Sequence, residues 1–119
     1  MGFPIPIHQA DRRYPTTATN AYAASAVVSA TGPGWLRAVY GYNSGAAQFI
    51  QIHDAAALPA NGVDCLFGIL VPASSPFSIA FGEEMKFENG IVLCNSSTNP
   101  AKTIGAADVQ FLCNWRLRA

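Results

Sequence analysis

The histidines and the carboxylates near them are the first candidates for catalytic residues. The sequence holds two histidines, His8 and His53, and Asp54 directly follows the second. A hydrolytic triad needs a base, an orienting acid and a nucleophile that converge in space. Neighbouring residues of a strand point to opposite faces, so Asp54 is not expected to orient His53. We therefore interpret His53 as a surface histidine at a strand end.

The remaining carboxylates form no convincing site. Glu83 and Glu84 are consecutive, which favours a solvated turn over an acid–base pair that faces one substrate. Asp54 and Asp64 flank a loop at Asn61-Gly62, but they lack the alternating oxygen ligands of a calcium loop.

The cysteines also argue against a chemical site. Cys65, Cys94 and Cys113 are odd in number, widely spaced and without a CxxC motif. This pattern argues against a zinc site and against a disulfide framework, so three unpaired thiols are expected. The sequence therefore predicts a protein that is not an enzyme, with no catalytic residue, no metal and no cofactor.

Aromatic side chains are the better candidates for binding. Trp115 lies on the apolar face of its strand pattern, which favours core packing. Trp35 follows a turn, and Tyr40 and Tyr42 share one face of the next strand. These three residues are candidates for surface contact, either with a sugar or with another subunit, because aromatic residues serve both kinds of contact.

Most of the chain consists of short strand patterns separated by turn signals. Val109, Phe111, Cys113, Trp115 and Leu117 alternate with largely polar residues, which is typical of a strand with one buried face. Similar patterns predict strands over residues 26–30, 35–42, 47–53, 66–71, 77–81, 85–88, 91–95 and 109–117. Asn89-Gly90 is the strongest two-residue turn signal. The predicted fold class is an all-β antiparallel sandwich or jelly roll of seven or eight short strands.

The first 24 residues differ from this pattern and predict an extended N-terminal arm, with the sandwich domain over residues 25–119. Phe3, Ile5 and Ile7 alternate with prolines that hold the segment extended. With Tyr14 they make the arm apolar, so we expect these four side chains to bind a partner. A disordered terminus is the alternative.

Composition indicates what kind of partner this is. Charged residues make up only 12% of the chain, and the formal net charge is zero. Charge is depleted in the core of subunit contacts, so the shortage favours a homo-oligomer such as a trimer, although an uncharged polar surface also explains it. Nothing points to nucleic acid, to a membrane span or to a secretory signal.

Three segments resemble small β-rich structural proteins of tailed bacteriophages. They are the run from Leu36 to Asn43, the strand from Gln48 that ends at Asp54, and the Phe87-Glu88-Asn89-Gly90-Ile91 strand that runs into a Ser/Thr turn. The resemblance implies a virion component made in the bacterial host cytoplasm, namely a capsid decoration or cement subunit that binds major capsid or tail proteins. A receptor- or carbohydrate-binding domain of a tail fibre is the alternative.

Overall fold

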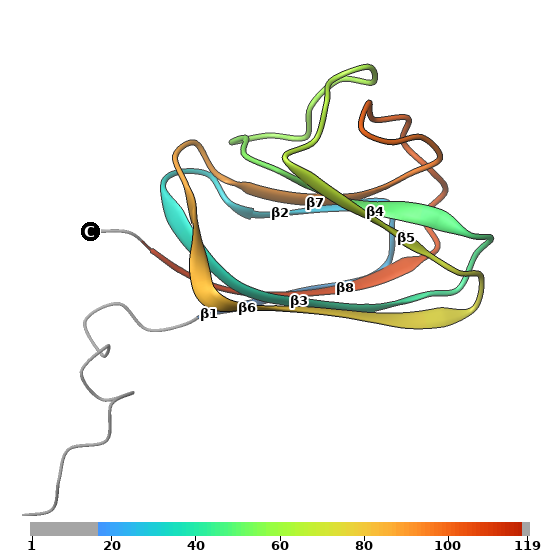
Figure 1. Ribbon diagram of the computed structural model, residues 1–119, viewed down its shortest axis with the longest axis horizontal. Helices are drawn as coiled ribbons and strands as arrows, with labels where there is room; N and C mark the ends of the chain where they lie inside the picture. The colour runs from blue at the N-terminus through green and yellow to red at the C-terminus, as the bar shows by residue number, and fades with distance from the viewer. Residues whose placement is uncertain (1–16, 118–119) are drawn as a thin grey trace, which may run out of the picture.

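Alternation of apolar and polar residues produces eight strands in the part of the chain that the computed structural model describes, residues 17–117. In chain order they are β1 (Thr17–Ala24), β2 (Ala26–Ala30), β3 (Gly34–Asn43), β4 (Gln48–His53), β5 (Phe67–Val71), β6 (Ser75–Phe87), β7 (Ile91–Ser96) and β8 (Val109–Leu117). They form two antiparallel sheets stacked face to face (Figure 1). The structure confirms the predicted all-β sandwich.

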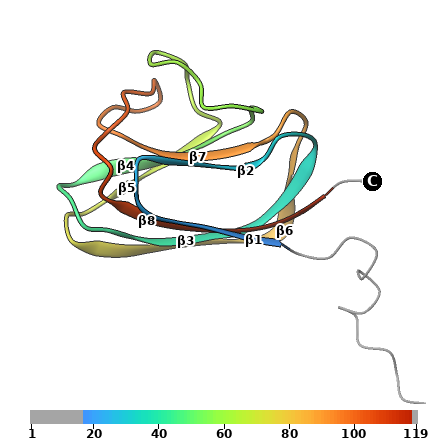
Figure 2. The same cartoon turned by 180° about the vertical axis from the view of Figure 1, so that it is seen from behind.

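The strand pairing makes this sandwich a jelly roll. One sheet, sheet A, has the order β1-β8-β3-β6, and the other, sheet B, has the order β2-β7-β4-β5. β4 pairs with β5, β3 with β6, β2 with β7 and β1 with β8. The chain is thus one long hairpin rolled into two layers, which is the arrangement of a jelly roll. Pairing of β3 with β8 and of β4 with β7 completes each sheet (Figure 2).

The core lies between the two sheets and comes from the inward side of the alternation. Phe111, Cys113 and Trp115 of β8 are buried, as the sequence pattern predicts. Phe111 meets Phe77 of β6 edge to face, with ring centroids 6.3 Å apart. Burying each large apolar side chain contributes roughly 1.5–3 kcal/mol, so this layer supplies most of the driving force for folding.

The domain begins earlier than the sequence predicts. The predicted arm covers residues 1–24, but Thr17–Ala24 pairs with β8 as an edge strand of sheet A. The small residues of this segment have a low preference for strands. The segment is a strand because it pairs with β8. The Trp115 indole Nε1 donates to Thr19 Oγ1 at 3.0 Å, which ties the strand down. Residues 1–16, with Phe3, Ile5, Ile7 and Tyr14, lie outside the described residues.

The predicted turn at Asn89-Gly90 is present, and it carries the chain from β6 of sheet A to β7 of sheet B. The Asp54 carboxylate stabilises this turn by accepting hydrogen bonds from the backbone amides of residues 88, 89 and 90 at 3.2, 2.8 and 3.4 Å. The predicted turn at Glu83 and Glu84 is wrong, since β6 runs unbroken through both of them.

Two long loops cover the outer face of sheet B. The segments 54–66 and 97–108 rise over it on the side away from sheet A (Figure 1). They bury residues that point out of the sandwich, among them Gln51, His53 and Cys94. Within residues 17–117, no comparable loops cover the outer face of sheet A (Figure 2). Between residues 17 and 117, no helix is long and apolar enough to cross a membrane.

Candidate functional site

His53 is buried, which corrects the prediction of a surface histidine. Only 2% of it is exposed, because the loops over sheet B cover the strand end on which it lies. Its Nε2 lies 3.1 Å from Gln51 Oε1. Burial, and secondarily the nearby Lys102 ammonium, lowers the pKa of His53. Asp54 is occupied by the turn at residues 88–90, so the two neighbours have separate partners and form no base–acid pair.

The polar side chains around His53 form a hydrogen-bonded layer between sheet B and its loops. Gln51 Nε2 donates to the carbonyl oxygens of Thr98 and Pro100 and to Asn99 Oδ1. Lys102, which is 2% exposed, donates from Nζ to Asn61 Oδ1 at 2.6 Å. Buried polar groups of this kind fasten the loops to the sheet, because each satisfied hydrogen bond avoids the cost of a buried unpaired group.

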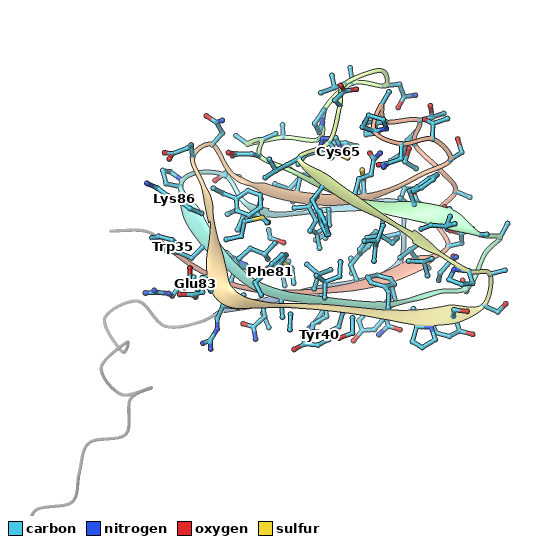
Figure 3. The ribbon with its side chains drawn as sticks, viewed as in Figure 1. Trp35, Tyr40, Cys65, Phe81, Glu83 and Lys86 are labelled. Atoms are coloured by element: carbon cyan, nitrogen blue, oxygen red, sulfur yellow. The ribbon has the colours of Figure 1, made fainter. Side chains whose placement is uncertain are left out.

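The three thiols are free, as predicted. Cys94 and Cys113 are fully buried on opposite sheets, and burial raises the pKa of each thiol to about 11. The nucleophilic form of cysteine is the thiolate, which a pKa this high disfavours. Cys65 is half-buried, and its Sγ contacts Asn99 Oδ1 at 3.3 Å (Figure 3). None of the three has the environment of an activated nucleophile.

Glu84 belongs to an ion-pair cluster on sheet A. Both of its carboxylate oxygens accept from Arg116 Nε at 2.9 Å, and Arg37 Nε lies 3.8 Å from Glu84 Oε2. The Arg116 guanidinium also sits 5.8 Å from the centroid of the Trp35 ring, in cation–π range. Glu84 is therefore paired with arginine across β6, β8 and β3. Residues 17–117 contain no group of three His, Cys, Asp or Glu side chains that could hold a metal ion.

The predicted aromatic residues of β3 lie on sheet A. Tyr40 and Tyr42 are 38% and 40% exposed. Tyr40 points outward, away from the core (Figure 3), and Tyr42 follows it on the same face of the strand. Trp35 is half-buried beside Arg116. A bulge between Leu36 and Ala38 lies between this tryptophan and the tyrosines. The structure thus confirms that the two tyrosines share a face, but it does not join all three rings into one flat platform.

A shallow hollow of about 340 Å³ adjoins Tyr40. It is lined by Arg37, Ala38, Tyr40, Ala80, Phe81 and Asn114. Within the described residues, the Asn114 side-chain oxygen is buried without a hydrogen-bond partner. Such a buried acceptor is uncommon in folded proteins.

Among the described residues, the longest exposed apolar run lies at β5, which is not among the binding candidates that the sequence indicates. Strand β5 is an edge of sheet B, and its residues Phe67 and Leu70 are 37% and 62% exposed. Leu66, directly before the strand, is 54% exposed. The run from 66 to 71 is recognisable in the sequence as a buried strand, because continuous apolar runs are typical of strands covered on both faces. The structure buries Val71 and packs Ile69 against the core, but it leaves Leu66, Phe67 and Leu70 exposed.

Known proteins give no guide to this surface. Comparison with protein-family models, with curated proteins and with solved structures found no match. The function is therefore inferred from the physical properties of the surface. An apolar strand edge can bind another polypeptide through backbone hydrogen bonds and side-chain burial. A shallow tyrosine-lined hollow can bind a small polar ligand such as a sugar.

Proposed function

We propose that this protein is a structural subunit of a bacteriophage particle, most simply a capsid decoration or cement subunit that binds neighbouring shell proteins and further copies of itself. The observation that carries the proposal is the uncovered apolar edge of β5. Soluble monomers blunt their sheet edges with charges, prolines, bulges or a covering loop. Over residues 67–71 the edge has no charge, no proline and no bulge, and this is explained if another protein covers it.

Two further properties support assembly as the function. The chain has half the charge usual for a soluble domain, 12% against about 25%. The core of a subunit interface is depleted in charge in the same way. The jelly roll itself is an architecture used by viral capsid proteins, and the resemblance of residues 36–43, 48–54 and 87–98 to phage structural proteins agrees with it.

The size of the protein in solution tests the proposal. Light scattering at micromolar concentration is expected to report an oligomer, because burying the β5 edge removes apolar surface from water. In a phage-producing host, the protein is also expected to band with intact particles in a density gradient. A species of 12.6 kDa at every concentration, and absence from the particle band, would contradict the proposal.

A receptor- or carbohydrate-binding domain is the second candidate, and the hollow beside Tyr40 favours it. A sugar ring stacks on a tyrosine face, and Arg37, which also lines the hollow, would donate to a sugar hydroxyl. On a glycan array this function predicts binding that is lost in Tyr40→Ala and kept in Tyr22→Ala, a change of an exposed tyrosine on β1. No glycan binding by the full-length chain leaves assembly as the better account.

A further inference from the structure

The four edge strands of the two sheets differ in how they are protected. β1 and β2 each carry a register shift that interrupts pairing, between Ala21 and Ala24 and between Val28 and Ala30. The third edge, β6, carries charged residues at 83, 84 and 86. Bulges and charges of this kind discourage another strand from adding to an edge.

The fourth edge, β5, has no such protection. Its five residues contain no charge and no proline, and they pair with β4 in unbroken register from Phe67 opposite Ile52 to Val71 opposite Gln48. Phe67 and Leu70 are three residues apart, so they lie on opposite faces of the strand. An added strand could therefore place its apolar side chains on either face of the sheet and contact an exposed apolar side chain of β5 there.

The chain itself contains a segment with the properties such a strand needs. Residues 3–7 read Phe-Pro-Ile-Pro-Ile. In an extended strand, Phe3, Ile5 and Ile7 would direct their backbone N–H groups to one side and their side chains to one face. Pro4 and Pro6, which have no N–H, would occupy the other side. The segment can pair with an edge on one side only, as prolines in edge strands do.

We propose that residues 3–7 of one copy add as a strand to the β5 edge of a neighbouring copy. This inference rests on the proposed function, since it names the contact by which copies associate. The prolines would face outward, so the added strand would end the sheet and offer no new edge. Strand addition to an exposed edge is a known mode of peptide recognition.

The topology favours a neighbour over the same chain. The segment joins the fold at Thr17 of β1, which is an edge of sheet A, whereas β5 is the edge of sheet B that lies at the β6 side of the sandwich. Residues 8–16 span at most about 30 Å when extended. On its own chain this linker would have to pass around the sandwich, but a neighbour's β5 is reached without crossing the fold.

The donor segment precedes β1 in the chain and the acceptor edge is β5, so two different surfaces would meet and the contact is head-to-tail. Such contacts form a closed ring when the rotation between neighbours permits it. This geometry is consistent with a small cyclic oligomer.

Two full-length variants separate the two halves of the contact. The donor-dead variant combines Phe3→Ser, Ile5→Ser and Ile7→Ser, which keeps the prolines and the length. The acceptor-dead variant is Leu70→Lys, which places a charge on the edge. Leu70 is exposed, so the domain should fold, and circular dichroism checks this. Each variant is expected to weaken self-association at least about tenfold, the effect of losing one buried apolar side chain.

The matched control is Tyr22→Lys. Tyr22 is 69% exposed on the β1 edge, comparable with Leu70 at 62%, so the control introduces the same charge on an apolar edge position. It is expected to associate as the unchanged protein does.

Mixing the two variants gives the decisive measurement. The donor-dead chain keeps an intact β5, and the Leu70→Lys chain keeps an intact segment. The mixture is expected to form a one-to-one complex of twice the 12.6 kDa subunit mass, which analytical ultracentrifugation resolves. The complex should grow no further, because its remaining segment and edge are both disabled.

The outcomes separate this inference from the proposed function. If the full-length protein associates but Leu70→Lys associates equally well, β5 is not the acceptor and only the inference fails. If Leu70→Lys and the donor-dead chain both fail to associate and their mixture forms no complex, pairing between copies in this way is also refuted. If the unchanged protein stays at 12.6 kDa but bands with particles, the inference fails while binding to the shell stands. If it stays at 12.6 kDa and is also absent from the particle band, the assembly function and the inference fail together.

Discussion

Gly41→Ala is expected to abolish cooperative folding, or to reduce the free energy of unfolding by more than about 3 kcal/mol, the upper range for overpacked cores. A Cβ at Gly41 would lie 2.0 Å from the backbone oxygen of Gln110 and 2.3 Å from Cζ of Phe77. A backbone oxygen cannot move away without separating β3 from β8. Because Gly41 has no side chain, β3 can pack closely against β8 and against the Phe77–Phe111 pair.

Urea denaturation followed by the fluorescence of buried Trp115 measures this effect. The matched control is Gly82→Ala in β6, where no atom lies within 4 Å of the position that a Cβ would take. The control should change the free energy of unfolding by about 0.5 kcal/mol or less. An unfolding midpoint for Gly41→Ala equal to that of the control would refute this packing of the sandwich.

Asn43→Ala is expected to reduce the free energy of unfolding by roughly 2–5 kcal/mol, because several buried partners would lose their hydrogen bonds at about 1–3 kcal/mol each. Asn43 is fully buried where β3 leaves sheet A. Its Nδ2 donates to the carbonyl oxygens of Ala46 and Pro72 at 2.8 and 3.0 Å. Its Oδ1 accepts from Gly45 N and Gln48 Nε2. One side chain thus fastens the corner between the two sheets.

The same denaturation experiment checks this prediction. Asn20→Ala is the control, since Asn20 is an exposed asparagine of β1. We expect Asn20→Ala to unfold as the unchanged protein does. Equal stability of the two variants would mean that the corner does not depend on Asn43.

The strands could be predicted from the sequence because alternation is a local property. The spacing of four apolar residues predicts β8, and the structure buries all of them: Val109, Phe111, Cys113 and Trp115. Strand β1 escaped prediction because Thr17–Ala24 has small residues and takes its stability from β8, which lies about ninety residues further along the chain. Asn89-Gly90 correctly marks a turn, but a turn signal does not say which sheet the next strand joins.

Predicting the candidate site from the sequence requires knowledge of which distant segments pack together. The sequence places Tyr40 and Tyr42 on one face, and they are exposed there. It does not show that β5 becomes an edge, because strand order depends on how the long hairpin rolls up. The burial of His53 was missed for a similar reason: it follows from loops that fold back over sheet B.

Amide hydrogen exchange across β5 tests the central claim most directly, since that claim makes the β5 edge a binding surface. Exchange reports whether each backbone amide is hydrogen-bonded and covered. In the full-length protein at a concentration where it associates, amides of residues 67–71 should exchange more slowly than in the donor-dead variant at the same concentration, while those of β7 exchange alike. Equal exchange of the β5 amides in both proteins would contradict the account.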